Sequence, residues 1–186
     1  MKTQKSLIKI EKALKRSKVK IPTQIKLRLS ELLLNLRTRR KRFGLFVILG
    51  WQNKWRGYTD ISDQTQDIFK KHNVNVMTLG QQNPKAAKEV GSTVNFDGAI
   101  LINGKGRIMS SGVILEGLRP RAVASKINPG HFSDLSEQLG FKQKVHSRHL
   151  FAIASSYTFK GTTVFTISEE TNTFHIFEGG RIVYEG

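Results

Sequence analysis

From residue 43 onward the chain is a succession of short apolar runs separated by glycine, proline and asparagine, and this order limits the fold. The run 44–49 is apolar throughout, which is typical of a strand covered on both faces. Strands and helices alternate early, whereas strands follow one another at the end. We expect strands at 44–49, 74–79, 99–102, 107–115, 162–168, 174–177 and 181–184, and helices at 62–72, 84–90, 133–139 and 149–159. This order predicts an α/β protein with a single mixed β-sheet flanked by helices.

Most of the charge lies in residues 1–42. They hold 15 lysines and arginines against two acidic residues, a net charge of +13 out of +17 for the whole chain. This asymmetry predicts a basic helical arm over 1–42 and a separate domain over 43–186. Apolar residues at helical spacing predict an amphipathic helix that Pro22 ends or kinks, and a second helix after it. The residues are Leu7, Ile10, Leu14 and Ile21 in the first, and Ile25, Leu29, Leu32, Leu33 and Leu36 in the second.

Three roles stay open for this arm. The helices can pack on the domain or on another subunit. Alternatively, the clustered cations can bind nucleic acid or dock on an anionic membrane surface. The arm has no phenylalanine, tyrosine or tryptophan, which weakens the case for stacking on single-stranded bases and removes aromatic membrane anchors.

The absence of cysteine limits the chemistry and the location. It excludes disulfides, thiolate metal sites and a thiolate nucleophile. It also fits a reducing compartment, so we expect a cytoplasmic protein. The longest apolar run, 43–51, is too short to cross a bilayer.

Two short segments carry the candidate chemistry. Asp97 and Gly98 stand directly before an apolar strand, and Ser147, Arg148 and His149 stand where a helix begins. A carboxylate can hold a metal ion or draw a proton from a hydroxyl, and a glycine lets the backbone approach a ligand. Arginine and histidine beside helical N–H groups suit a phosphate. Together the segments indicate a nucleotide site for chemistry on phosphate.

Other motifs are better explained structurally. The segment 103–106, Asn-Gly-Lys-Gly, lies between apolar strands and is typical of a hairpin turn; no phosphate-binding G-x-x-x-x-G-K-[ST] loop is present. The five histidines have no zinc-binding spacing. Ser147 and His149 are two residues apart at a helix start, so they do not face each other as a hydrolase pair, and capping the helix suits Ser147 better.

Three segments, taken in this order, resemble the diadenylate cyclase domain family, and its archaeal-type members most of all. Asp97-Gly98-Ala99 matches the family's Asp-Gly-Ala motif. Ser147-Arg148-His149 matches its Thr-Arg-His segment, and residues 168–171 match its Ser-Glu-Glu-Thr stretch. The resemblance spans residues 43–186.

The resemblance implies a nucleotidyltransferase that condenses two ATP molecules into cyclic di-AMP and two pyrophosphates. It implies Asp97, Arg148 and His149 as catalytic residues, with Asp97 also the ligand of Mg²⁺ or Mn²⁺. The product has two equivalent linkages, so the two ATP molecules face each other across a two-fold axis, which requires a homodimer or a higher oligomer. The implied nucleotide-binding residues are Gly98, Ala99, Leu115, Ser147, Arg148, His149, Ser168 and Glu170.

Departures from the family pattern keep two other functions open. His146 stands where a glycine is usual, Leu150 stands where many members have a second arginine, and the connection 116–146 is long. These features favour a catalytically silent nucleotide-binding regulatory module. The basic arm favours a nucleic-acid-binding protein.

Overall fold

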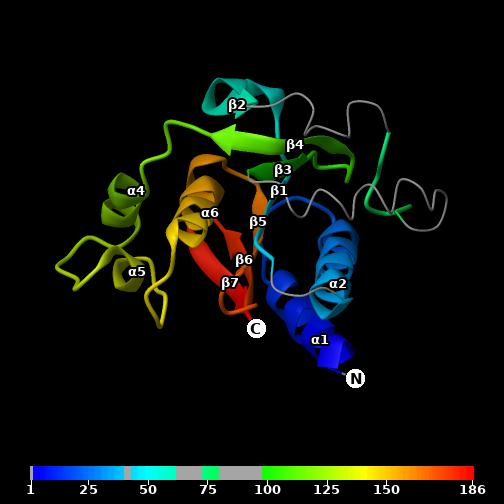
Figure 1. The fold of residues 1–186 in the computed structure, drawn as a ribbon, viewed down its shortest axis with the longest axis horizontal. Coiled ribbons are helices and arrows are strands. Elements are labelled where there is room, and N and C mark those ends of the chain that lie inside the picture. Colours follow the sequence, from blue (N-terminus) through cyan, green and yellow to red (C-terminus); the bar gives the residue numbers. More distant parts are fainter. Residues whose placement is uncertain (1, 40–42, 62–72, 80–97) are drawn as a thin grey trace.

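The computed structural model describes residues 2–39, 43–61, 73–79 and 98–186. Its centre is a mixed seven-stranded sheet in the order β2-β4-β3-β1-β5-β6-β7 (Figure 1). Strands β1 and β3 are parallel, and the other neighbouring strands are antiparallel. The predicted α/β class with one mixed sheet is therefore confirmed. The strands are β1 (Leu45–Leu49), β2 (Thr59–Ile61), β3 (Ala99–Ile102), β4 (Ile108–Leu115), β5 (Thr163–Ile167), β6 (Phe174–Glu178) and β7 (Arg181–Glu185).

Helices cover both faces of the sheet. Helices α1 and α2 pack on one face, and α6 with the shorter helices packs on the other (Figure 1). Strand β1 shows why its run is apolar throughout. Leu45, Val47 and Leu49 contact the α1–α2 layer, while Phe46 and Ile48 contact the α6 layer. The helices are α1 (Lys2–Leu14), α2 (Thr23–Arg39), the 3₁₀ helix η1 (Asn53–Tyr58), α4 (Pro120–Ile127), α5 (Leu135–Gln138) and α6 (Ser147–Thr158).

The N-terminal helices form part of the main hydrophobic core. Ile10 and Leu14 of α1 and Leu34 of α2 are almost completely buried in the cluster that contains β1 and β5. Helix α2 starts directly after Pro22, as predicted, but α1 ends at Leu14. Ile21, which we expected on the first helix, is therefore buried from the segment between the helices.

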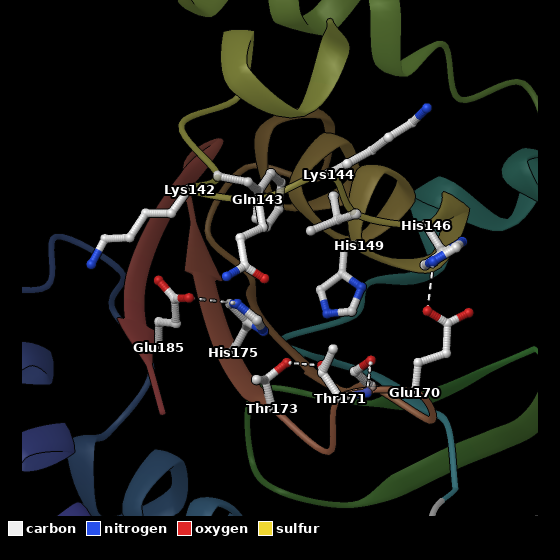
Figure 2. Close-up of a pocket in the computed structure, with 13 residues that line it drawn as sticks. Lys142, Gln143, Lys144, His146, His149, Glu170, Thr171, Thr173, His175 and Glu185 are labelled. Atoms are coloured by element: carbon white, nitrogen blue, oxygen red, sulfur yellow. Dashed lines mark hydrogen bonds and ion pairs between the residues drawn. The ribbon is translucent and has the colours of Figure 1, made fainter.

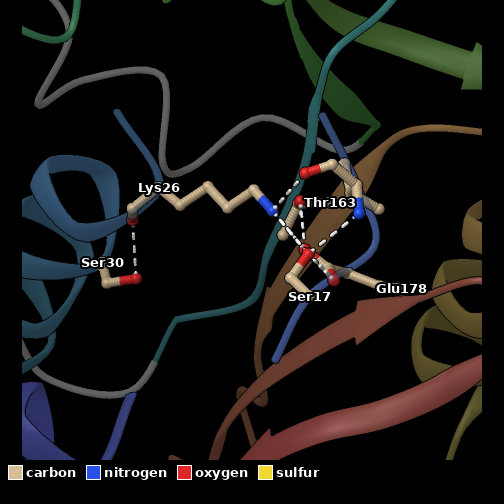
Figure 3. A network of polar contacts seen from close by, with 6 residues as sticks. Ser17, Lys26, Ser30, Thr163 and Glu178 are labelled. Carbon is tan, nitrogen blue, oxygen red and sulfur yellow. Dashed lines mark hydrogen bonds and ion pairs between the residues drawn. The ribbon is translucent and has the colours of Figure 1, made fainter. Parts of the chain in front are cut away.

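A buried polar network ties this segment to the sheet (Figure 3). Lys26 of α2 donates to Glu178 of β6 at 2.9 Å, to Ser17 at 2.8 Å and to the carbonyl of Val19 at 3.2 Å. The Glu178 carboxylate also accepts from Ser17 and, at 2.6 Å, from Thr163. The ion pair is almost inaccessible to water, with exposed side-chain fractions of 1% and 7%. Lys26 thus differs from the solvent-facing lysines of α1.

Other predicted elements have mixed outcomes. The hairpin over 99–115 and the three closing strands are confirmed. The strand predicted at 74–79 is wrong: this segment makes one isolated bridge, between Asn75 and Arg107, and then turns. Helix α4 was not predicted, because Pro120 resembled a breaker, although proline is well tolerated in a first helical turn. The helices predicted at 62–72 and 84–90 lie outside the described residues.

Candidate functional site at one end of the sheet

Strand register brings two of the candidate segments to the same end of the sheet, beside the start of β1. Gly98 directly precedes β3, Gly44 directly precedes β1, and Ser168 directly follows β5. Val47 of β1 pairs with Ile100 of β3, while Leu45 pairs with Ile167 of β5. Gly98, Gly44 and Ser168 therefore occupy neighbouring positions at the ends of adjacent strands. We call this end of the sheet the Gly98 end.

Gly98 is required by the sheet itself. Its φ angle is +101°, and a Cβ atom there would lie 2.7 Å from the carbonyl carbon of Gly112 and 2.8 Å from the amide nitrogen of Val113. Contacts that short are excluded for a real side chain, so glycine lets β3 begin directly against β4. This is a second reason for glycine beside the predicted approach to a nucleotide. Asp97, the residue before it, lies outside the described residues.

Helix α6 presents its first turn at this end of the sheet. His146 is the N-cap residue and Ser147 is the first helical residue, so the capping role predicted for Ser147 is wrong. The guanidinium of Arg148 lies over Gly44: a Cβ atom on that glycine would be 1.7 Å from Nη1 and 2.3 Å from Cζ. The absence of a side chain at position 44 thus makes the space for Arg148. The charge of Arg148 therefore lies at the start of β1, which is part of the Gly98 end.

A cavity of about 210 Å³ lies between the start of α6, the β5–β6 connection and the end of β7. His149, Ser168 and Glu170 line it, and all three were predicted as nucleotide-binding residues (Figure 2). Ala99, Leu115, Ser147 and Arg148 do not line this cavity. Ala99 is buried in the core on the α6 face, while Leu115 ends β4 and is half-buried.

Two neighbouring histidines form the inner wall of the cavity (Figure 2). The ring centroids of His149 and His175 are 4.8 Å apart and the rings are nearly perpendicular. Both side chains are buried; burial lowers the pKa of His175 to about 4, and burial together with neighbouring His175, Arg148 and His146 lowers the pKa of His149 to about 4. Near neutral pH, His149 therefore offers hydrogen bonds and no charge.

Polar atoms of this wall and of its neighbour Thr166 have unused hydrogen-bonding capacity. Within the described part of the chain, His149 Nε2, His175 Nδ1 and Thr166 Oγ1 are buried without a hydrogen-bond partner. Thr166 and His175 are direct cross-strand neighbours on β5 and β6. A buried polar atom without a partner costs about 1–3 kcal/mol, and of these three residues only His149 and His175 line the cavity.

The sequence did not indicate a role for His175. It lies within the strand Phe174-His175-Ile176-Phe177, in which every residue is buried. Alternation along such a strand does not tell which face holds a functional group. The available signal was only a lone titratable residue among apolar ones, and His149, its neighbour in space, is 26 positions away in the sequence.

A close contact joins two exposed side chains that line the cavity, His146 and Glu170. His146 Nε2 lies 2.5 Å from Glu170 Oε2, and both side chains are mostly exposed. Ser168 Oγ accepts a hydrogen bond of 3.2 Å from the backbone N–H of Thr171, which leaves its own O–H to donate. The site thus combines an arginine, a hydroxyl donor and a neutral imidazole.

The described part of the chain does not contain a group of three or more histidine, aspartate or glutamate side chains that could hold a metal ion. This does not conflict with Mg²⁺, which typically uses one or two carboxylates together with substrate phosphates. Among the helices that the structure describes, each is too short or too polar to cross a membrane.

Comparisons with known proteins do not assign this chain to a family. No family model and no curated protein matches the chain. A hypothetical membrane spanning protein from Bacillus cereus superposes with a TM-score of 0.48 at 15% identity, over 84% of this chain and 60% of that one. The chain therefore spans less than two thirds of that protein's length. DacA from Staphylococcus aureus, in a double-mutant form, gives a TM-score of 0.40 at 13% identity, over 97% and 86% of the two chains.

Proposed function

We propose that the protein is a diadenylate cyclase, which joins two ATP molecules into cyclic di-AMP and releases two pyrophosphates. One observation carries the proposal. The strand that follows Asp97 begins at the same end of the sheet as the Arg148 guanidinium and Ser168, next to a cavity at the start of α6. These groups come from segments far apart in the sequence, and each suits one part of a nucleoside triphosphate.

Arg148 and the first turn of α6 are the proposed phosphate cradle. The guanidinium supplies a permanent positive charge, and the N-terminus of a helix attracts anions through its free N–H groups. The hydroxyl of Ser168 donates a hydrogen bond to a phosphate oxygen. His149 adds a hydrogen bond from a neutral ring, because burial lowers its pKa to about 4.

Asp97 is the proposed catalytic carboxylate. It accepts the proton of a ribose 3′-hydroxyl, whose oxygen attacks the α-phosphorus of the other ATP; the bond to the β-phosphate breaks and pyrophosphate leaves. The same exchange at the second ATP closes the ring. Bound at Asp97, Mg²⁺ or Mn²⁺ would neutralise charge on the phosphate. Each protomer holds one ATP, so a two-fold homodimer is required to bring the reacting groups together.

The test is a product assay. The full chain is incubated with ATP and either Mg²⁺ or Mn²⁺, and the mixture is analysed by mass spectrometry for cyclic di-AMP. Asp97→Ala should abolish the product while it leaves most of the ATP affinity, because it removes proton and metal handling and not the phosphate cradle. Product formed by Asp97→Ala at the parent rate would refute this role.

Two further variants test the cradle. Arg148→Ala should weaken ATP binding by about 1.5–3 kcal/mol, the usual cost of losing a charged hydrogen bond. Gly44→Ala should act in the same direction without removing the arginine, because the new Cβ would displace its guanidinium. Arg181→Ala removes an equal charge from the exposed start of β7 and serves as the matched control. Equal ATP affinity in all four proteins would exclude Arg148 as a phosphate ligand.

A silent nucleotide-binding module is the second candidate. The contact between His146 and Glu170 occupies the lining of the cavity, and Leu150 packs in the core on the α6 face. If the protein is such a module, it binds ATP but forms no cyclic di-AMP with either Mg²⁺ or Mn²⁺. His146→Gly then frees Glu170 and restores the residue usual in the family, and a gain of product in that variant would identify His146 as the block.

A further inference from the structure

The outward face of α1 is a row of positive charges. Lys5, Lys9 and Lys12 are exposed and follow the spacing i, i+4 and i+7, which places them on one side of the helix. The opposite side holds Ile10 and Leu14, with exposed fractions of 0% and 1%. The row is therefore fixed outward by the packing of the helix. We call these three residues the α1 basic face; Arg16 is exposed in the turn that follows the helix.

Little negative charge compensates this face. Residues 1–42 contain two acidic residues: Glu11 pairs with Lys15 at 3.0 Å, and Glu31 pairs with Arg28 at 2.7 Å on α2. Lys18 and Lys20 are also exposed directly after the helix. A planar anionic partner would therefore meet several cations at once. The row from Lys5 to Lys12 is about 10 Å long at the usual helical rise.

One apolar side chain stands out among these cations. Ile8 is 64% exposed, more than any other large hydrophobic residue in the described part of the chain. It lies one turn from Lys5 and from Lys12. On a surface that offers only charge, this side chain gains nothing. At a lipid interface it leaves water, while lysine stems keep their ammonium groups among the headgroups.

We infer that the α1 basic face docks the protein on an anionic lipid membrane. The cations meet lipid phosphates and carboxylates, and Ile8 enters the boundary of the acyl region. The lack of aromatic side chains in residues 1–42 counts against base stacking and against aromatic membrane anchors alike, so the exposed Ile8 is the feature that favours lipid over nucleic acid. Helix α1 packs on the face of the sheet opposite to α6, so a docked protein keeps the α6 cavity away from the lipid.

Vesicle co-sedimentation of the full chain tests this inference. The probes are phosphatidylcholine vesicles with and without phosphatidylserine, and binding is expected only to the anionic vesicles. The triple variant Lys5→Glu, Lys9→Glu, Lys12→Glu should lower the partition coefficient by roughly a hundredfold or more, since each basic residue near such a surface adds about fivefold. Ile8→Ala should lower it severalfold.

The matched control reverses three exposed lysines elsewhere: Lys105→Glu, Lys126→Glu and Lys160→Glu. The net charge is the same in both triple variants, so equal losses would show attraction by net charge alone and would overturn the inference. It is also overturned if Ile8→Ala binds like the parent, or if duplex DNA releases the protein from vesicles at equal phosphate concentration. These positions are solvent-facing and remote from the α6 cavity, so product formation from ATP in solution is unaffected whichever result is obtained.

Discussion

The substitution Lys26→Met tests whether the buried ion pair holds the N-terminal helices on the sheet. Methionine preserves most of the volume of the lysine stem but removes the ammonium group. Glu178 then stays in a site with 7% of its side chain exposed, with only the hydroxyls of Ser17 and Thr163 to satisfy its charge. The change therefore isolates the charge from the packing of α2.

The expected loss is large because one partner of a buried pair is removed. Breaking such a pair costs about 3–5 kcal/mol, whereas replacing both partners by apolar residues of similar volume is often neutral. Total stabilities are about 5–15 kcal/mol, so the single variant loses a substantial part of its free energy of unfolding. For a chain of 186 residues this corresponds to a fall in Tm of about 6–20 °C.

The assay is urea denaturation of four proteins: the parent, Lys26→Met, the double variant Lys26→Met with Glu178→Met, and Lys15→Met. Lys15 forms an ion pair with Glu11 in the same arm, but with exposed side-chain fractions of 68% and 44%. Its loss should cost less than about 1 kcal/mol. The double variant should recover most of the stability that the single variant loses. If Lys26→Met loses no more than Lys15→Met, the buried pair does not hold the arm on the sheet.

Three other predictions concern the core and the site. Gly98→Ala should cost about 2 kcal/mol or more in urea denaturation, because φ is +101° and β4 backbone lies 2.7 Å from the new Cβ; Gly104→Ala, with open space around it, should be near neutral. The pKa values of His149 and His175 are lowered from 6.5 to about 4, so the unfolded chain binds more protons between these values. The free energy of unfolding should therefore be fully present above pH 6.5 and fall, by roughly 1–3 kcal/mol, as the pH drops toward 4. His175→Phe should flatten this dependence, and an equally steep profile in that variant would contradict the assignment. Ser156→Ala removes the acceptor of a buried backbone N–H in the β6–β7 turn, 2.9 Å away, and should cost about 1–3 kcal/mol by thermal denaturation.

Local signals in the sequence were sufficient for much of the secondary structure. The hairpin over 99–115 follows from two apolar runs around a glycine-rich turn, and the closing strands follow in the same way. These features depend on residues close together in the chain, where turn chemistry and side-chain period act directly. The basic pair at a helix start indicated His149, the resemblance to diadenylate cyclases added Ser168 and Glu170, and the structure places all three around one cavity.

Other features of the protein depend on contacts between residues distant in the sequence, and only the tertiary structure decides them. In sequence, Lys26 resembles the other lysines of the arm, and its burial follows from a carboxylate 152 positions away. Arg148 lies over Gly44 because β1 and the first turn of α6 meet at one end of the sheet. His175 lies beside His149 because β6 passes under α6. Burial, pairing and the pKa of a side chain are set by neighbours in space, and one chain without its fold does not specify those neighbours.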